Sequence, residues 1–189
     1  MGKVVSEQEL IVRCRERKED GEKIVFVAGI FELLHPGHVR LLEQARDQGD
    51  VLVAAVLDDA SARDVLAAAS EPIKVYGRGL PQRTGAETAR QKPPKLGVER
   101  PVTPAAERAE ILAALAAVDY AVEVWIDSLP ELLAQLRPDV AVENAEPSWP
   151  TLVAEAAERA GVELVRIASE PGHSTAGIIE RIVQLSGSE

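Results

Sequence analysis

The stretch from Ile24 to Leu42 constrains this chain most, because an apolar run leads directly into a loop that contains two histidines. The run begins IVFVA and includes the β-formers Val25 and Val27, which is typical of a strand buried on both faces. We expect Gly29 to let the chain leave the strand in a conformation closed to other residues, and Pro36 then opens a helical pattern. The sequence therefore predicts a strand-to-helix junction at the tetrapeptide HPGH.

His35 and His38 would lie where this helix begins. The first N–H groups of a helix have no partners within it and the helix dipole is positive there, so the position favours an anion, most often a phosphate. A single histidine at such a place is more often an ordinary loop or helix residue. Here two of the chain's three histidines fall in one tetrapeptide, and we predict that both face a phosphate.

The composition argues against several classes of protein. A net charge of −10 and an aromatic content of only 3% disfavour nucleic-acid binding, which requires a basic surface or stacking side chains. No apolar run approaches the roughly 18 residues of a membrane span, and the N-terminal residues lack the pattern of a signal peptide. The single cysteine, Cys14, has no disulfide partner in the chain and is expected to be an ordinary helix residue. We expect a cytoplasmic protein with no membrane or nucleic-acid partner.

Strand-like runs alternate with helical patterns over residues 1–189, which we expect to form one domain. The expected strands begin at residues 24, 51, 120, 139 and 162. The expected helices span 6–18 (within an N-terminal segment 1–22), 36–49, 61–69, 101–119, 128–136, 151–160 and 175–185. Strands separated by helices imply parallel pairing through right-handed crossovers. The pattern predicts a Rossmann-like, doubly wound α/β fold, in which helices cover both faces of a five-stranded parallel sheet.

Polar residues follow some of these strands, at the edge of the sheet where α/β proteins bind ligands. Asp58 and Asp59 come directly after the second strand and would either contact a substrate or cap the next helix, and capping is the commoner role. Arg108 is expected on the polar face of a helix with Thr103 as its N-cap and Pro104 in its first turn.

The third histidine, His173, precedes the last helix, where Ser174 and Thr175 have the chemistry of N-cap residues. Their hydroxyls and the first-turn amides would equally suit the β- and γ-phosphates of a nucleotide. Both interpretations remain open.

Residues 70–100 are expected to form a long loop rich in Pro and Gly. From Lys74 to Arg100 this segment carries seven basic and two acidic residues, a net charge of +5 in an acidic chain. It is either a basic flap that closes over a triphosphate or a solvated insertion. Lys95 and Arg100, near its end, are expected to face a ligand.

The segment GIFELLHPGH, residues 29–38, resembles the HxGH signature of the nucleotidyltransferase superfamily, which contains cytidylyltransferases and several adenylyltransferases. Apart from the insertion after Ala69, nearly the whole chain is similar to the heptose 1-phosphate adenylyltransferases, through segments such as ERPVTPAAERAEILAALAAVDY and STAGIIERI. The resemblance implies transfer of AMP from ATP, or of another nucleotide from its triphosphate, to a sugar phosphate or similar phosphorylated small molecule. Pyrophosphate would be released, Mg²⁺ would accompany the nucleotide, and a homodimer would suit the family.

The resemblance also implies roles for individual residues. Those expected to act in catalysis by contacting phosphates are His35, His38, Lys95 and Arg108. Those expected to bind the nucleotide are Ala28, Gly29, Ile30, Phe31, Gly37, His173, Ser174 and Thr175. Those expected to bind the second substrate are Glu32, Asp58, Asp59, Arg100 and Glu143. No residue is assigned to a metal.

Two alternatives remain open. The residues Glu143-Asn144-Ala145-Glu146-Pro147 stand where the family has Lys-Gly-Gly-Asp-Tyr, which reverses a charge near a polyanion and would fit a nucleotide-binding or regulatory protein without turnover. The three histidines with Asp58 or Asp59 would fit a zinc-dependent hydrolase, although helical zinc pairs more commonly use positions i and i+4.

Overall fold

A computed structural model describes residues 2–69, 100–145, 153–168 and 172–186 of the chain. Its strands are β1 (Lys3–Val4), β2 (Ile24–Gly29), β3 (Val51–Leu57), β4 (Tyr120–Val124), β5 (Val140–Asn144) and β6 (Glu163–Ile167). Its helices are α1 (Glu7–Glu19), α2 (Pro36–Arg46), α3 (Asp59–Ala69), α4 (Ala105–Ala113), the 3₁₀ turn η1 (Ile126–Ser128), α5 (Leu129–Leu136), α6 (Ala154–Ala160) and α7 (Thr175–Ser186). Within these ranges no helix combines the length and the apolar composition of a bilayer span. The basic segment, except its last residue Arg100, lies outside the described residues.

The strands form one parallel sheet in the order β1-β4-β3-β2-β5-β6. The predicted parallel α/β fold is confirmed, but the expected number of strands is one too low. The additional strand, β1, pairs only Lys3 and Val4 with β4. Two residues are too few to produce a recognisable periodicity in the sequence, so this strand becomes visible only through its pairing.

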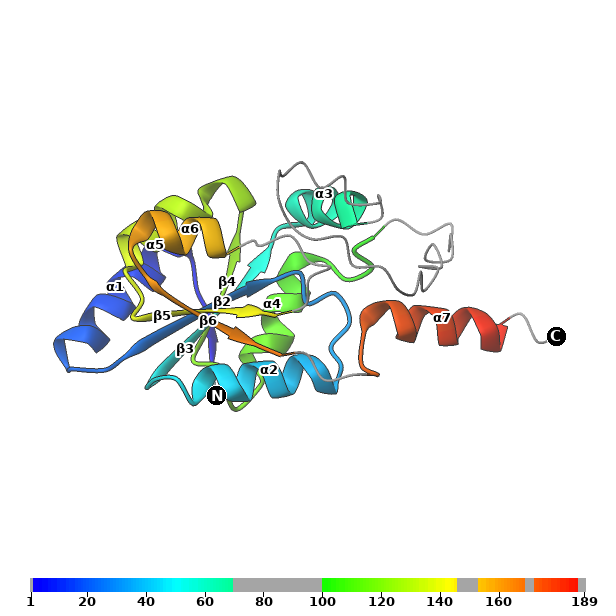
Figure 1. The fold of residues 1–189 in the computed structure, drawn as a ribbon, viewed down its shortest axis with the longest axis horizontal. Coiled ribbons are helices and arrows are strands. Elements are labelled where there is room, and N and C mark those ends of the chain that lie inside the picture. The colour runs from blue at the N-terminus through cyan, green and yellow to red at the C-terminus, as the bar shows by residue number, and fades with distance from the viewer. Residues whose placement is uncertain (1, 70–99, 146–152, 169–171, 187–189) are drawn as a thin grey trace, which may run out of the picture.

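Helices cover both faces of the sheet (Figure 1). Leu10 of α1, Leu133 of α5 and Ala157 of α6 belong to the core on one face, whereas Leu42 of α2 and Leu112 of α4 belong to the core on the other. The chain adds β3 and β4 on one side of β2 and then crosses back to place β5 on the other side. The strand order thus reverses between β2 and β5, and in such sheets ligands bind in the crevice at the carboxyl ends of those two strands.

The central strands are buried on both faces, as their composition predicts. All seven residues of β3 are buried, and so are the first four of β2. At the other end of the sheet, two aspartate side chains satisfy backbone N–H groups of neighbouring strands. Asp139 accepts from the Ile24 N–H and Asp119 accepts from the Leu52 N–H, each at 2.8 Å. Cys14 packs in the core on the face of α1, and burial raises the pKa of its thiol to about 12, as befits a structural residue.

Two local expectations are wrong. Thr103 does not cap α4, because the N-cap position falls on Pro104, without a side-chain capping hydrogen bond. Gly29 does not take a left-handed conformation; the left-handed residue is Phe31, with φ of 51°. The space at position 29 favours glycine instead, since a Cβ there would lie 3.0 Å from the Phe31 ring and the ring would have to shift.

Leu112 and Ile111 are consecutive residues of α4 in opposite environments, one fully buried and the other 47% exposed. The variant Leu112→Ala is expected to lower the free energy of unfolding by about 2–5 kcal/mol, because it removes buried methyl groups and leaves a cavity. Ile111→Ala, its matched control, is expected to lose much less. Denaturant titration of both variants measures the difference, and equal losses would contradict the packing of α4 against the sheet.

Candidate active site

The HPGH tetrapeptide forms the junction between β2 and α2, at the carboxyl edge of the sheet. His35 is the N-cap of α2, with Pro36 in the first turn, and its Nδ1 accepts weakly from the His38 N–H at 3.4 Å. The two imidazoles stack, with ring centroids 3.8 Å apart and planes inclined by 19°. The predicted strand-to-helix junction is confirmed, and the two rings lie together at the positive end of a helix.

His38 is the more enclosed of the reactive groups at this junction. Its ring meets the Phe31 ring edge-on at 5.4 Å, and its Nδ1 is buried without a hydrogen-bond partner among the described residues. Burial, and to a lesser degree the neighbouring His35, lower the pKa of His38 to about 4, although a backbone hydrogen bond with Leu33 acts in the opposite direction. At neutral pH the ring is therefore uncharged, and one of its nitrogens is buried without a hydrogen-bond partner among the described residues.

His173 joins the other two histidines from the far end of the chain. A Cβ added at Gly37 would lie 3.0 Å from the Nδ1 of His35 and 3.3 Å from the Cβ of His173. Any residue larger than glycine would therefore push these two side chains apart. Ser174 follows directly, and its Oγ accepts from the Gly177 N–H at 3.0 Å, so Ser174 caps α7 as expected. The sequence brings the starts of α2 and α7 to one place, although 137 residues separate Pro36 from His173.

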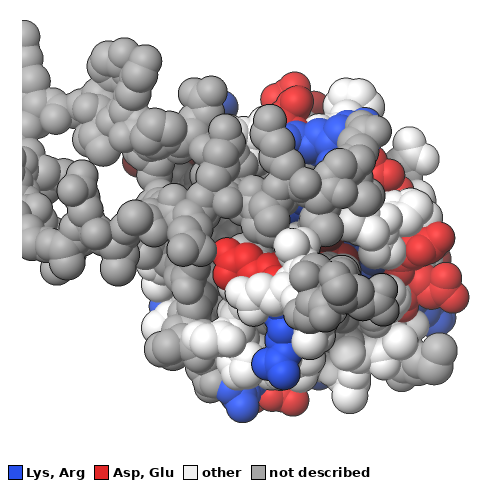
Figure 2. Space-filling model, turned by 90° about the vertical axis from the view of Figure 1, so that its right-hand side faces the viewer, with Lys and Arg blue, Asp and Glu red and all other residues white. Residues whose placement is uncertain are grey.

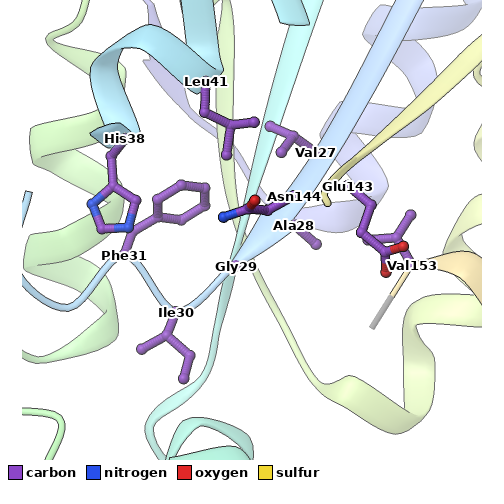
Figure 3. A pocket seen from close by; sticks show the side chains of 10 residues that line it. All are labelled: Val27, Ala28, Gly29, Ile30, Phe31, His38, Leu41, Glu143, Asn144 and Val153. Atoms are coloured by element: carbon purple, nitrogen blue, oxygen red, sulfur yellow. The ribbon is translucent and has the colours of Figure 1, made fainter. Parts of the chain in front are cut away.

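A pocket of about 570 Å³, part of it open to solvent, lies at the carboxyl ends of β2 and β5, beside His38. Its lining includes six predicted site residues: Ala28, Gly29, Ile30, Phe31, His38 and Glu143. Four further lining residues were not predicted from the sequence: Val27, Leu41, Asn144 and Val153. Figure 3 shows that Asn144 extends toward Phe31 and His38 whereas Glu143 extends toward Val153. The position of Asn144 at the end of a strand could have indicated a pocket residue. Nothing local in the sequence distinguishes the apolar lining residues from residues of the hydrophobic core.

Arg108 is not on the polar face of its helix, as the sequence suggested, but fully buried. Its Nε donates to the carbonyl of Thr103 at 2.8 Å, and its Nη1 donates to the carbonyl of Ile30. Its Nη2 donates to the carbonyl of Leu57 at 2.9 Å and to the Asp59 carboxylate at 2.7 Å. One guanidinium thus joins the loops that follow β2 and β3 to the segment that precedes α4. In this arrangement Arg108 positions the site, and its contact with a phosphate stays a prediction.

The other acidic candidates are also engaged within the protein. Glu32 is buried; it accepts from the Arg100 Nε at 3.0 Å and from the Val102 N–H at 3.0 Å, in an ion pair that anchors the segment before α4. Asp58 accepts from the Ser61 N–H at 3.1 Å and so caps α3, the commoner of its two expected roles. None of these side chains lines the pocket. Substrate contact by Glu32, Asp58 and Arg100 remains a prediction.

Two further expectations concern Lys95 and a zinc site. Lys95 lies outside the described residues. The zinc alternative finds no support in the described ranges, which hold no cluster of three or more His, Cys, Asp or Glu side chains suited to a metal.

The end of the molecule from which α7 projects faces the viewer in Figure 2. Acidic and basic residues are interspersed over its described surface. The described residues therefore form no broad basic face there, and within them anion binding would depend on individual groups, such as the start of α2 and the paired imidazoles.

Residues 26–75, which contain β2, the HPGH junction and β3, match the family described as Cytidylyltransferase-like. These residues are therefore similar to the cytidylyltransferase-like proteins, which confirms the resemblance inferred from residues 29–38. The chain is 34% identical over 180 residues to the bifunctional protein HldE of Azotobacter vinelandii and 36% identical over 181 residues to that of Acidiphilium cryptum. Each alignment covers 95% of this chain but only 32% and 31% of the relative, so the chain spans about one third of these proteins.

Two solved structures share the fold. A lipopolysaccharide core biosynthesis protein from Thermoplasma volcanium superimposes with a TM-score of 0.55 at 21% identity, over 79% of this chain and 99% of that one. A pantoate-beta-alanine ligase from Francisella tularensis, complexed with beta-gamma ATP and beta-alanine, superimposes with a TM-score of 0.53 at 11% identity, over 90% of this chain and 68% of that one. At these identities the likeness establishes the Rossmann-like architecture alone.

Replacement of Arg108 tests its positioning role. The variant Arg108→Met is expected to lose about 3–5 kcal/mol of unfolding free energy, because it leaves three buried carbonyls and one carboxylate without their donor. Arg13→Met, its control, removes an exposed arginine paired with Glu9 and is expected to change stability little. Thermal and denaturant unfolding compare the two variants, and a fully stable Arg108→Met protein would show that the guanidinium is dispensable.

The depressed pKa of His38 predicts a pH dependence of stability. An exposed imidazole in the unfolded chain protonates near 6.5, whereas His38 in the folded protein protonates near 4. Between these values the unfolded state binds more protons, so this contribution to stability is complete above pH 6.5 and is lost as the pH falls toward 4. An NMR titration of the ring should give a midpoint of about 4, and one near 6.5 would contradict the burial. In His35→Gln the midpoint should rise, since one of the depressing charges is gone.

Proposed function

We propose that this protein is a nucleotidyltransferase, which transfers AMP from ATP to a phosphorylated sugar or similar small molecule and releases pyrophosphate. The observation that carries the proposal is the pair of stacked imidazoles at the start of α2, beside a pocket at the point where the strand order reverses. The similarity of 95% of the chain to HldE proteins supports the same assignment.

The proposed reaction is an in-line displacement at the α-phosphorus of the nucleotide. An oxygen of the acceptor's phosphate forms a bond to that phosphorus, and the bond between the α-phosphorus and the bridging oxygen breaks, so pyrophosphate leaves with the electron pair. Such transfers depend mainly on positioning and on stabilisation of the charge that develops on the phosphoryl oxygens. The protein needs no covalent intermediate for this chemistry.

His35, His38 and the first-turn amides of α2 would stabilise that charge. The Nδ1 of His38, which has no hydrogen-bond partner in the described part of the chain, supplies a position that is already desolvated, where an interaction with a phosphate oxygen is stronger than in water. An arriving anion would also favour the protonated form of the ring and raise its pKa from about 4. Ser174, Thr175 and the start of α7 would hold the β- and γ-phosphates from the other side of Gly37.

Mg²⁺ would arrive with the triphosphate. This ion keeps several waters and binds phosphate oxygens readily, often with only one or two protein carboxylates, so it does not require a preformed cluster of ligands. Its contribution would be to neutralise charge on the departing pyrophosphate. We assign no protein residue to it.

Pyrophosphate release tests the function. Purified protein, ATP and Mg²⁺ would be incubated with a panel of sugar and polyol phosphates, and the active mixture identified by a coupled pyrophosphate assay. His35→Asn and His38→Asn are each expected to lower the rate about 10²–10³-fold, the usual effect of removing one transition-state donor. Gln44→Ala, on the exposed side of α2, is the control, and a chelator should abolish turnover.

Two outcomes would contradict the proposal. One is a protein that binds ATP in a calorimeter but releases no pyrophosphate with any acceptor, which would indicate a nucleotide-binding protein without turnover. The other is turnover that survives both histidine replacements, which would place the chemistry elsewhere.

A further inference from the structure

Glu143 ends the pocket on the side away from the histidines, and its carboxylate is only half satisfied. Oε2 accepts from the Nε of Arg166 on β6, at 3.3 Å, whereas Oε1 is buried and has no hydrogen-bond partner among the described residues. The Glu143 side chain is 10% exposed, and that of Arg166 is 56% exposed. A carboxylate oxygen that has lost its water without gaining a donor is unfavourable, and this one borders a cavity.

The pocket therefore has two different ends. At one end lie the start of α2 and a histidine nitrogen, which suit an anion. At the other lies a carboxylate, which repels a phosphate and can only accept hydrogen bonds. Among the described residues, the space between them is lined mostly by aliphatic side chains and by no Lys or Arg. A substrate in this pocket would place its phosphate toward the histidines and a part rich in hydrogen-bond donors toward Glu143.

The ion pair with Arg166 limits which kind of hydrogen-bond donor on a substrate would suit Glu143 Oε1. Glu143 and Arg166 together are formally neutral, so Oε1 has no need of a second cation. A neutral O–H donor satisfies it without adding charge to the interior. The Val153 side chain lies beside this end (Figure 3), and its apolar surface suits the C–H groups of a sugar better than a charged group.

We propose that Glu143 binds the hydroxyl groups of a polyol, with Oε1 accepting from one or two O–H groups of a diol. The terminal torsion of a glutamate is broad, so a small rotation turns this oxygen into the cavity. The inference rests on the proposed nucleotidyl transfer and names what its pocket selects: a hydroxyl-bearing moiety and not a second phosphate. The diol belongs either to the ribose of the nucleotide or to the acceptor.

Calorimetry with paired ligands tests the proposal. The first pair is ATP and 2′,3′-dideoxy-ATP. The second, measured with the protein saturated by α,β-methylene-ATP, is each active sugar phosphate and its deoxy counterpart. Glu143→Ala is expected to weaken the hydroxyl-bearing member of one pair about tenfold or more and to leave the deoxy member unchanged. The pair that responds identifies the source of the diol. Glu163→Gln, which changes an exposed carboxylate at the start of β6, is the matched control.

Three outcomes would overturn the inference. The first is a Glu143→Ala protein that binds both members of every pair as the wild type does. The second is a Glu143→Ala protein that binds every anion more tightly, which would show that Glu143 acts only by repulsion. A response to ATP that disappears with ITP would assign the contact to the amino group of the base. If the wild type turns over and the Glu143 variants bind their ligands unchanged, only this inference is refuted. If the wild type binds neither ATP nor any sugar phosphate, the proposed function is refuted as well.

Discussion

The carboxyl edge of the sheet depends on one buried cation. The Arg108 guanidinium is closed off from water and donates to the backbone after β2, to the backbone at the end of β3 and to Asp59 at the start of α3. A buried charge is tolerated only when its hydrogen bonds and its ion pair are satisfied, so these loops and the guanidinium stabilise one another. The loop that carries Phe31 into the HPGH junction is fixed at its root in this way. The geometry of the histidines is therefore set partly by a residue that does not touch them.

Near the Arg108 guanidinium, the candidate site combines groups that carry no full charge at neutral pH. His38 is neutral at pH 7 because it is buried and lies against another imidazole, and the helix contributes partial charges from its amides. Such a site has little attraction for simple anions in solution, yet it can strengthen its interaction as negative charge develops, because its ring becomes easier to protonate. The opposite end of the pocket carries the negative charge of the Glu143 carboxylate. The arrangement favours a substrate with an anionic end and a hydroxylated end.

Much of this could be predicted from the sequence, and the failures have identifiable physical causes. The HPGH junction and the alternation of strands and helices follow from local patterns, because strand burial and helix capping leave periodic and positional signals. Six pocket residues were predicted through the resemblance to the HxGH family. Arg108 was misplaced because an arginine on a helix is usually exposed, and only the tertiary arrangement supplies its four acceptors. The Glu32–Arg100 pair joins residues 68 positions apart. Gly29 was explained by backbone freedom when the neighbouring Phe31 ring is the constraint, which no local pattern reveals.

The reversal of strand order has a consequence for how the molecule must be made. β2 is formed early in the chain, but its neighbour β5 comes more than a hundred residues later, and Ile24 acquires its acceptor only from Asp139. Until that strand docks, the HPGH loop borders an open edge of the sheet and no crevice exists beside it. During synthesis the nascent chain therefore carries the reactive histidines long before it carries a binding cavity. The crevice beside the histidines therefore depends on a pairing between strands that lie far apart in the sequence.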